Sequence, residues 1–166
     1  MNARRFKILV GVDGSACSAR AVRHAAHLAL RLDAEIDMVH VFPHTTTATM
    51  TALGFVADAT GEFSEAKRQL VELRESALPG GLPVQIHMRL GEPVRGLLDA
   101  IEQLEPDMVI LGTHGRGTVM RAIMGSVSEQ LVRKSPVPVM VVPPDREAAP
   151  VATGRVEEPP RSTDRA

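Results

Sequence analysis

Five short apolar runs alternate along the chain with longer stretches in which apolar residues recur every three or four positions. The runs occupy residues 6–12, 36–42, 84–90, 108–111 and 137–142. Short apolar runs are typical of strands, and their alternation with stretches of helical period predicts right-handed βαβ units around a parallel sheet. The pattern therefore predicts an α/β fold, with an open five-stranded parallel sheet covered by helices on both faces.

The runs differ in ways that predict the place of each strand. Residues 84–90 alternate strictly between apolar and polar, which indicates one solvated face and suits a sheet edge. Residues 108–111 are wholly apolar and suit a central strand. Residues 137–142 are also apolar on both faces, yet the final strand of an open sheet is expected at an edge, where it invites pairing with another chain. We therefore predict a homodimer joined along residues 137–142.

Three stretches of helical period each present one apolar face. Their predicted inward residues are Ala21, Ala25, Leu28 and Leu32, then Phe63, Ala66, Leu70 and Leu73, then Val94, Leu97, Leu98, Ile101 and Leu104. Two other stretches have no clear period. Residues 44–60 are rich in Thr and Ala and are interpreted as a loop or lid, and residues 145–166 are predicted to form a disordered tail. The domain is thus expected to span residues 1–144.

Composition excludes several classes of function. The net charge is −1 and the arginines are scattered, so neither a nucleic-acid nor a membrane-binding surface is expected. Four Phe without Trp or Tyr offer little surface on which bases could stack. The apolar runs are too short to span a membrane. The single Cys17 has no internal disulfide partner, which favours a reducing compartment and predicts a cytoplasmic protein.

Glycines are concentrated directly after the fourth predicted strand. The sequence there reads Leu111-Gly112-Thr113-His114-Gly115-Arg116-Gly117 and, after a short segment, Gly125-Ser126-Val127-Ser128-Glu129. Glycines at the end of a strand let the backbone approach a ligand closely and turn its amide groups toward phosphate. Ser126 and Glu129 have capping-box spacing, which predicts a helix beginning at Ser126 whose first amide groups attract an anion.

The predicted topology brings these glycines to a second polar position. In an open parallel sheet, ligands bind outside the carboxyl ends of the strands, where the winding reverses. If the strand order is 3-2-1-4-5, Asp13 after the first strand and Gly112 after the fourth flank this point. The end of the second strand would wall one side. Three segments are therefore predicted to converge on one crevice.

The spacing Gly112-x2-Gly115-x9-Gly125-Ser126 resembles the ATP-binding motif of the universal stress protein family, and the likeness spans residues 5–143. The resemblance implies a Rossmann-like sheet of order 3-2-1-4-5, of the type found in adenine nucleotide alpha hydrolases. It also implies dimerisation through the last strand. The ligand implied is ATP, bound with Mg²⁺.

The resemblance further assigns roles to residues around the crevice. It implies an adenine pocket formed by Val12, Asp13 and the backbone at Val41, and ribose contacts near Gly112. It implies phosphate contacts at Gly115, Arg116, Gly125, Ser126 and Val127. The full predicted cofactor-binding set is Gly11, Val12, Asp13, Val41, Leu111, Gly112, Thr113, His114, Gly115, Arg116, Gly117, Gly125, Ser126, Val127 and Ser128. No catalytic residue and no metal-ligating residue is predicted.

Other interpretations stay open at the level of sequence. Each glycine alone could serve only a turn or a helix cap, and Asp13 could cap the helix that follows it. The chain has no Gly-x4-Gly-Lys-Ser/Thr loop, and no convincing general base is found for efficient hydrolysis. The leading hypothesis is a regulatory ATP-loaded homodimer whose surface is read by an unknown protein partner in the stress response. The alternatives are a nucleotide-free dimeric scaffold and a slow ATPase or autophosphorylating protein.

Overall fold

Five parallel strands form the central sheet of the computed structural model, which describes residues 4–42, 48–50, 56–58, 61–113 and 124–144. The strands are β1 (Lys7–Gly11), β2 (Glu35–Phe42), β5 (Val84–Leu90), β6 (Met108–Gly112) and β7 (Val139–Val142). They lie in the order β5-β2-β1-β6-β7, and each neighbouring pair is parallel. Numbered along the chain, this is the predicted order 3-2-1-4-5, and both predicted edge strands are confirmed.

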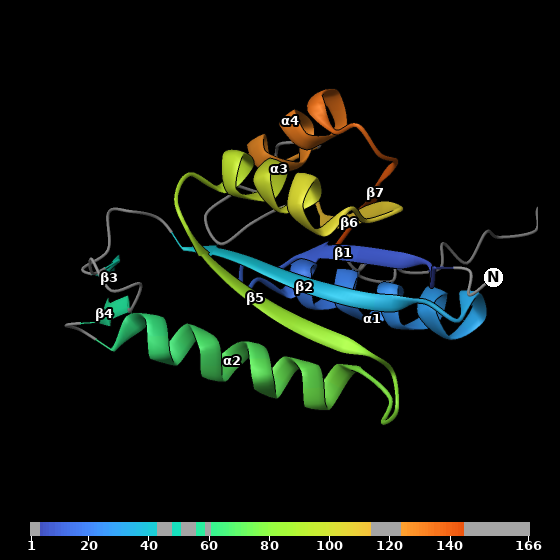
Figure 1. Cartoon of the computed structure of the whole chain (residues 1–166), viewed down its shortest axis with the longest axis horizontal. Helices are drawn as coiled ribbons and strands as arrows, with labels where there is room; N and C mark the ends of the chain where they lie inside the picture. The colour runs from blue at the N-terminus through green and yellow to red at the C-terminus, as the bar shows by residue number, and fades with distance from the viewer. Residues whose placement is uncertain (1–3, 43–47, 51–55, 59–60, 114–123, 145–166) are drawn as a thin grey trace, which may run out of the picture.

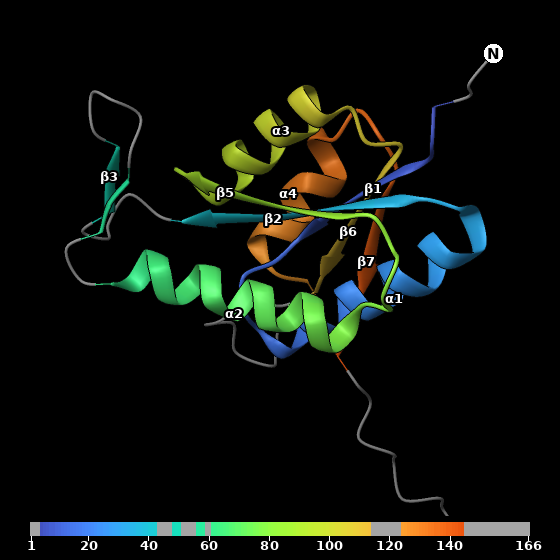
Figure 2. The same cartoon turned by 60° about the horizontal axis from the view of Figure 1, so that its bottom comes forward.

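Four helices cover the two faces of this sheet, as predicted. Helices α1 (Ala16–Leu32) and α2 (Glu62–Ala77) lie on one face, and α3 (Pro93–Leu104) and α4 (Ser126–Lys134) lie on the other (Figures 1 and 2). Each face has its own buried apolar cluster between sheet and helices. The winding therefore reverses between β1 and β6, which puts the topological switch point where the sequence predicts it.

Helix α1 follows its predicted pattern except at its end. Its inner face is rich in alanine, and fully buried Ala21, Ala25 and Ala29 let the helix lie close to the sheet. Leu32, predicted to point inward, is 48% exposed. That prediction is wrong because Leu32 is the last helical residue, and Asp33 in the left-handed conformation turns the chain away at the margin of the sheet.

The segment between β2 and α2 contains more regular structure than a loop. Strands β3 (Ala48–Met50) and β4 (Val56–Asp58) pair in antiparallel fashion. They lie beyond the end of β2, next to the start of α2 (Figures 1 and 2). The interpretation of residues 44–60 as a loop or lid did not include these two strands, since three residues are too few to show an alternating pattern. The rest of that segment, and residues 145–166 predicted as a tail, lie outside the described residues.

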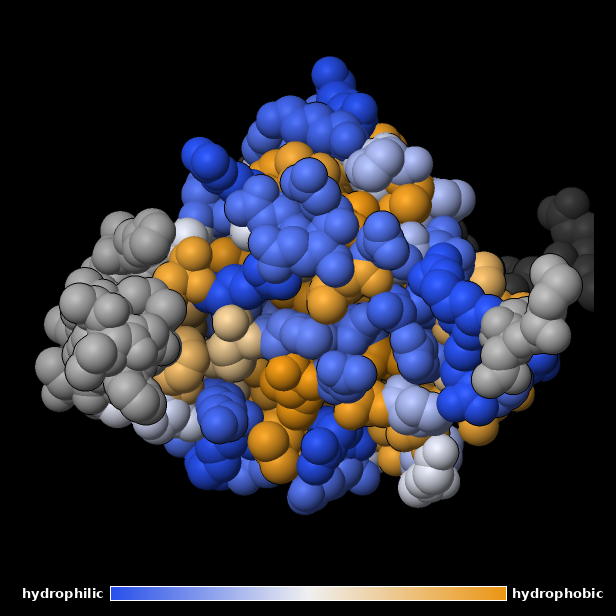
Figure 3. Space-filling view, viewed as in Figure 1, coloured by the Kyte–Doolittle hydropathy of each residue, from blue (hydrophilic) through white to orange (hydrophobic). Residues whose placement is uncertain are grey.

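The outward side of the molecule is mixed in polarity. On the face seen in Figure 3, hydrophobic residues lie scattered among hydrophilic ones. Helix α2 is buried mainly at Leu70. On its outer side Arg68 contacts both Glu65 and Glu72. In the described part of the chain, no helix combines the length and the apolar character that crossing a membrane requires.

Candidate functional site

The carboxyl ends of β1 and β6 lie side by side at the switch point. Their parallel register pairs Val10 with Ile110, and β6 in turn pairs Gly112 with Val142 of β7. The chain leaving β1 through Asp13 and the chain leaving β6 through Thr113 therefore emerge at the same edge of the sheet. The structure thus brings together the two segments that sequence analysis placed here.

The glycine-rich segment is fixed at both of its stems. The amide of Gly125 donates to the carbonyl of Thr113 at 2.5 Å, and the amide of Thr113 donates to the carbonyl of Val142 at 3.0 Å. The Ser128 hydroxyl, in a residue that is 5% exposed, donates to the carbonyl of Gly112 at 2.7 Å. The stems are therefore closed together over the end of the sheet. His114, Gly115, Arg116 and Gly117, which sequence analysis placed in the site, lie outside the described residues.

Helix α4 begins at Ser126, as predicted, but the predicted capping box is wrong. The N-cap residue is Gly125, and no side chain caps the helix. The reason is that the bond to Thr113 places Gly125 at the turn into the helix, and the Gly125 carbonyl accepts from the Glu129 amide at 2.9 Å. Ser126 is therefore already the first helical residue. The amides of the first turn, which have no acceptor inside a helix, are left without a capping side chain beside the loop stems.

One glycine of the predicted set is also required by packing. A Cβ on Gly112 would lie 2.8 Å from the backbone carbon of Cys17 in the first turn of α1. At Gly11 the nearest atom to an added Cβ is the end of the flexible Leu111 side chain, which can move aside. Gly112 therefore lets α1 and the end of β6 approach each other closely, a role similar to the helix-packing glycine of dinucleotide-binding folds. Its presence is explained before any ligand is considered.

Asp13 shapes the turn between β1 and α1. One of its carboxylate oxygens accepts from the Ser15 amide at 3.0 Å, and the intervening Gly14 has a positive φ of 77°. The N-cap of α1 is Ser15, whose hydroxyl accepts from the Ser18 amide at 3.1 Å. The alternative interpretation of Asp13 as the helix cap is therefore wrong. Asp13 is half-buried and lies two residues beyond the end of β1, at the switch point.

The end of β2 lies beside the end of β1 and packs against α3. Val41 is half-buried and lies against α3, where a Cβ on Gly96 would come within 2.7 Å of a Val41 methyl. Next to it, His40 Nδ1 lies 2.6 Å from the carbonyl oxygen of Val12. His40 is not among the site residues predicted from the sequence. Because β2 also carries Glu35 and Asp37, one more polar residue in this strand gives no distinct signal.

A small cavity borders this end of β1 and β2. Its volume is about 30 Å³, and it is lined by Val12, Gly14, His40, Ala66, Gln69, Leu70 and Leu73. A larger hollow of about 610 Å³ lies at the opposite end of the strands, between the end of α3 and the start of β7. The larger one is far from the glycine-rich segment and belongs to no strand switch point. We therefore place the candidate site at the small cavity and the loop stems.

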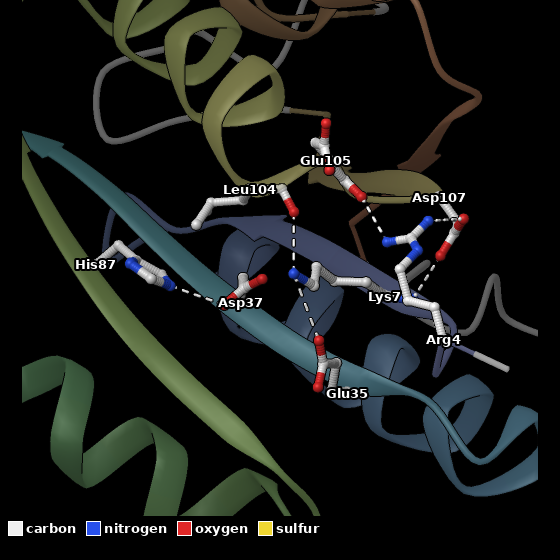
Figure 4. Close-up of polar contacts among 8 residues, drawn as sticks. All are labelled: Arg4, Lys7, Glu35, Asp37, His87, Leu104, Glu105 and Asp107. Carbon is white, nitrogen blue, oxygen red and sulfur yellow. Dashed lines mark hydrogen bonds and ion pairs between the residues drawn. The ribbon is translucent and has the colours of Figure 1, made fainter. Parts of the chain in front are cut away.

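Polar contacts at the far end of the sheet are structural. The Lys7 ammonium donates to the Leu104 carbonyl at 2.9 Å and lies 3.4 Å from Glu35, so it ties three elements together (Figure 4). Asp37, with a side chain 5% exposed, pairs with His87 Nε2 at 2.7 Å across β2 and β5 (Figure 4). In the described part of the chain, no group of three His, Cys, Asp or Glu residues could hold a metal ion.

An ion-pair network on the outer side of α2 shifts the pKa of two of its members. On the outer side of α2, hydrogen bonds from the Arg68 guanidinium lower the pKa of Glu65, with a smaller contribution from Gln69. Hydrogen bonding and charge attraction from Glu65, with a smaller contribution from Glu72, raise the pKa of Arg68. Both residues belong to an exposed ion-pair network on a solvated helix, which explains the shifts without any catalytic role.

Comparison with known proteins gives one consistent result. The family model of the universal stress protein family matches residues 5–143. Universal stress protein MJ0531 of Methanocaldococcus jannaschii is 27% identical over 139 residues, covering 82% of this chain and 81% of its own. Hypothetical protein MJ0577 superposes with a TM-score of 0.69 at 23% identity, over 85% of this chain and 97% of that one.

Two further solved structures have the same fold and hold a nucleotide. A universal stress protein in complex with cAMP aligns with a TM-score of 0.63 and 22% identity, over 84% of this chain and 98% of that one. The universal stress protein from Archaeoglobus fulgidus in complex with dAMP aligns with a TM-score of 0.61 and 19% identity, over 84% of this chain and 98% of that one. At these identities the likeness shows a shared fold.

Proposed function

The chain belongs to the universal stress protein family, and from that premise we propose that it binds ATP at the switch point and acts as a regulatory homodimer in the stress response. In this proposal nucleotide occupancy changes a surface that a partner protein reads. The cytoplasm is the proposed compartment, because a single thiol at Cys17 suits a reducing environment.

One observation carries the proposal: the first turn of α4 has no capping side chain and begins at the fixed stem of the glycine-rich segment. Helix N-termini attract anions because their first amides lack acceptors and carry the positive end of the helix dipole. The stem bond between Gly125 and Thr113 holds those amides at the crevice. A phosphate group is the anion that best fits such an arrangement of backbone donors.

The adenine base is the second part of the proposal. Related folds have been solved in complex with cAMP and with dAMP, which both carry adenine. In this chain the end of β2 and the turn at Asp13 supply backbone groups and a carboxylate beside the switch point. We propose that the base binds there, with the phosphates extending toward the start of α4.

Mg²⁺ is proposed to accompany the nucleotide. The described residues offer no cluster of carboxylates and imidazoles that could hold a metal by itself. Mg²⁺ commonly keeps several waters and takes its remaining ligands from substrate phosphates. The donor set of the described residues therefore suits an ion delivered with the triphosphate better than an independent metal site.

Binding without efficient turnover is the proposed activity. Hydrolysis requires a group that activates or orients water beside the terminal phosphate. The Ser128 hydroxyl proton is committed to the Gly112 carbonyl, and Asp13 holds the turn at Ser15. These contacts favour a structural use of both residues. Slow ATP turnover or autophosphorylation is the alternative that the same site could support.

Dimerisation is proposed along β7. This strand lies at the sheet edge, and its Met140 is 38% exposed. An edge strand with exposed apolar side chains pairs readily with a second copy of itself. Pro136 and Pro138 precede it and limit pairing to the strand proper. A nucleotide-free dimeric scaffold is the competing function, since the same edge would serve it equally.

The test compares nucleotide content and thermal stability. We expect native mass spectrometry of the purified protein to reveal co-purified adenine nucleotide, and millimolar ATP with Mg²⁺ to raise the melting temperature by mass action. Gly125→Ala should remain folded, because Gly125 has φ −72° and ψ 153°, which any residue adopts, and should lose the shift. Gly80→Ala, at a position with open space around it, is the matched control and should keep the shift. Absence of nucleotide together with an unmoved melting temperature supports the scaffold.

A further inference from the structure

The hydrogen-bonded ladder between β1 and β2 stops before β2 ends. Its last registered pair is Gly11 with Val39, and the Val12 amide still donates to the Val39 carbonyl at 2.9 Å. In a parallel ladder the next bond would run from the Val41 amide to the Val12 carbonyl. Among the described residues this backbone bond is not formed, although β2 continues to Phe42.

The side chain of His40 takes the place of that missing donor. Its Nδ1 lies 2.6 Å from the Val12 carbonyl oxygen. A carbonyl oxygen can only accept, so Nδ1 carries the proton in this contact. The ring is positioned by an edge-on contact with Phe42, at 5.8 Å between centroids, and Phe42 makes a similar contact with Phe63 of α2.

Because a side-chain donor replaces the backbone donor, the Val41 amide is left outside the ladder. Alternate residues of a strand direct their amide and carbonyl groups to opposite neighbours, so Val41 directs its groups toward β1, as Val39 does. Because β1 has ended and His40 occupies the Val12 carbonyl, the ladder does not use the Val41 amide. A backbone donor and a backbone acceptor are therefore presented side by side at the crevice.

We propose that His40 is a positioning residue that gives the crevice its selectivity for adenine over guanine, an inference that rests on the proposed nucleotide binding. The Val41 amide is a donor and its carbonyl is an acceptor. Adenine offers a matching ring-nitrogen acceptor beside its amino donor, whereas guanine offers a carbonyl and a ring N–H in the reverse arrangement. By holding the Val12 carbonyl, His40 keeps the Val41 peptide open to the base.

An apolar residue would fill the same space without this effect. Apart from His40, the cavity is lined by Gln69 and by the apolar residues Val12, Ala66, Leu70 and Leu73, together with Gly14. The imidazole adds a donor at the position where the ladder ends. Without it, the Val12 carbonyl would be left unpaired or would recruit the Val41 amide, since buried carbonyls seek a partner. Either outcome would alter the Val41 peptide group that is proposed to bind the base.

Two substitutions separate the donor from the ring. Asparagine at position 40 places its side-chain amide nitrogen near the position of Nδ1 and removes the ring. Phenylalanine keeps a ring against Phe42 and removes the donor. Binding of ATP, GTP and inorganic tripolyphosphate to the full chain and to each variant is measured by titration calorimetry. Circular dichroism melts confirm that each variant is folded.

The expected results differ by ligand. We expect the unmodified protein to prefer ATP to GTP, and His40→Phe to weaken ATP binding by about tenfold, the effect of one hydrogen bond of ordinary strength. Tripolyphosphate binding should be unchanged in this variant, because the phosphate contacts lie at α4. His40→Asn should retain most of the preference for ATP.

Several outcomes would overturn the inference. His40→Phe binding ATP as tightly as the unmodified protein would do so, as would equal losses for ATP and tripolyphosphate, which would indicate a general structural role. If His40→Asn loses as much ATP affinity as His40→Phe, the hydrogen-bond donor is not the cause of the loss. An unmodified protein that binds tripolyphosphate but does not distinguish ATP from GTP would overturn this inference alone. One that binds none of the three ligands would overturn the proposed function and the inference with it.

Discussion

Gly112 and Cys17 are in contact through their backbones: a Cβ on Gly112 would lie 2.8 Å from the carbonyl carbon and 2.8 Å from the Cβ of Cys17. The end of β6 is thereby pressed against the first turn of α1. This contact fixes the distance between the two elements that border the switch point. It also gives Gly112 a reason to be glycine that is independent of any ligand.

Replacing Gly112 with alanine is therefore expected to destabilise the fold. Backbone atoms cannot move aside as a flexible side chain can, so Gly112→Ala should lower the free energy of unfolding by about 1–3 kcal/mol or more, the usual range for overpacking. Gly80→Ala, with nothing within 4 Å of an added Cβ, should change it by less than about 0.5 kcal/mol. Urea unfolding measures both values. Equal stabilities of the two variants would contradict the packing role.

The two serines at the start of α4 are expected to behave in opposite ways. Ser128 donates to the Gly112 carbonyl and is buried, so Ser128→Ala should cost about 1–2 kcal/mol of unfolding free energy. Ser126 is exposed and caps nothing, so Ser126→Ala should be neutral or slightly stabilising, because alanine favours the helix. Thermal melts of both variants check this. A larger loss for Ser126→Ala would restore the capping box.

The layout of the fold follows from the sequence because it depends on strong, repeated signals. The alternation of apolar runs with helical periods sets a parallel sheet, and the polar alternation in residues 84–90 identifies an edge. Burial of helix faces is predicted well in mid-helix and fails at Leu32, where the chain turns. The three-residue strands β3 and β4 are missed because they are shorter than any period.

The candidate site is predicted less completely, because its details depend on which atoms meet in space. The convergence of Asp13 and Gly112 follows from strand order alone. The loss of the capping box at Ser126, the close approach of Gly112 to α1, and the contact of His40 with Val12 each depend on a non-local approach of the backbone. Spacing along one chain carries no signal for such approaches.

Gly96 in the first turn of α3 is expected to couple energetically to Val41. A Cβ on Gly96 would lie 2.7 Å and 2.9 Å from the two Val41 methyl groups, and a β-branched side chain has little freedom to rotate away. Gly96→Ala should therefore destabilise the protein even though alanine favours helices by about 1 kcal/mol. In the double variant with Val41→Ala the clash disappears, so the two effects should not add. A double-mutant cycle in urea that gives additive values would contradict this contact.

The Asp37 and His87 pair allows a final prediction about a buried charge. Asp37 has a side chain 5% exposed, and its partner in the described structure is His87 Nε2 at 2.7 Å. His87→Leu should cost about 2 kcal/mol of unfolding free energy, because it leaves a buried acceptor unpaired. Replacing both residues with leucine should recover most of that loss, since no unpaired group remains. The exposed pair of Arg133 and Glu129 is the control, and Arg133→Ala should change stability by less than about 0.5 kcal/mol. If the double leucine variant is less stable than His87→Leu alone, the pair contributes more than the relief of an unsatisfied carboxylate.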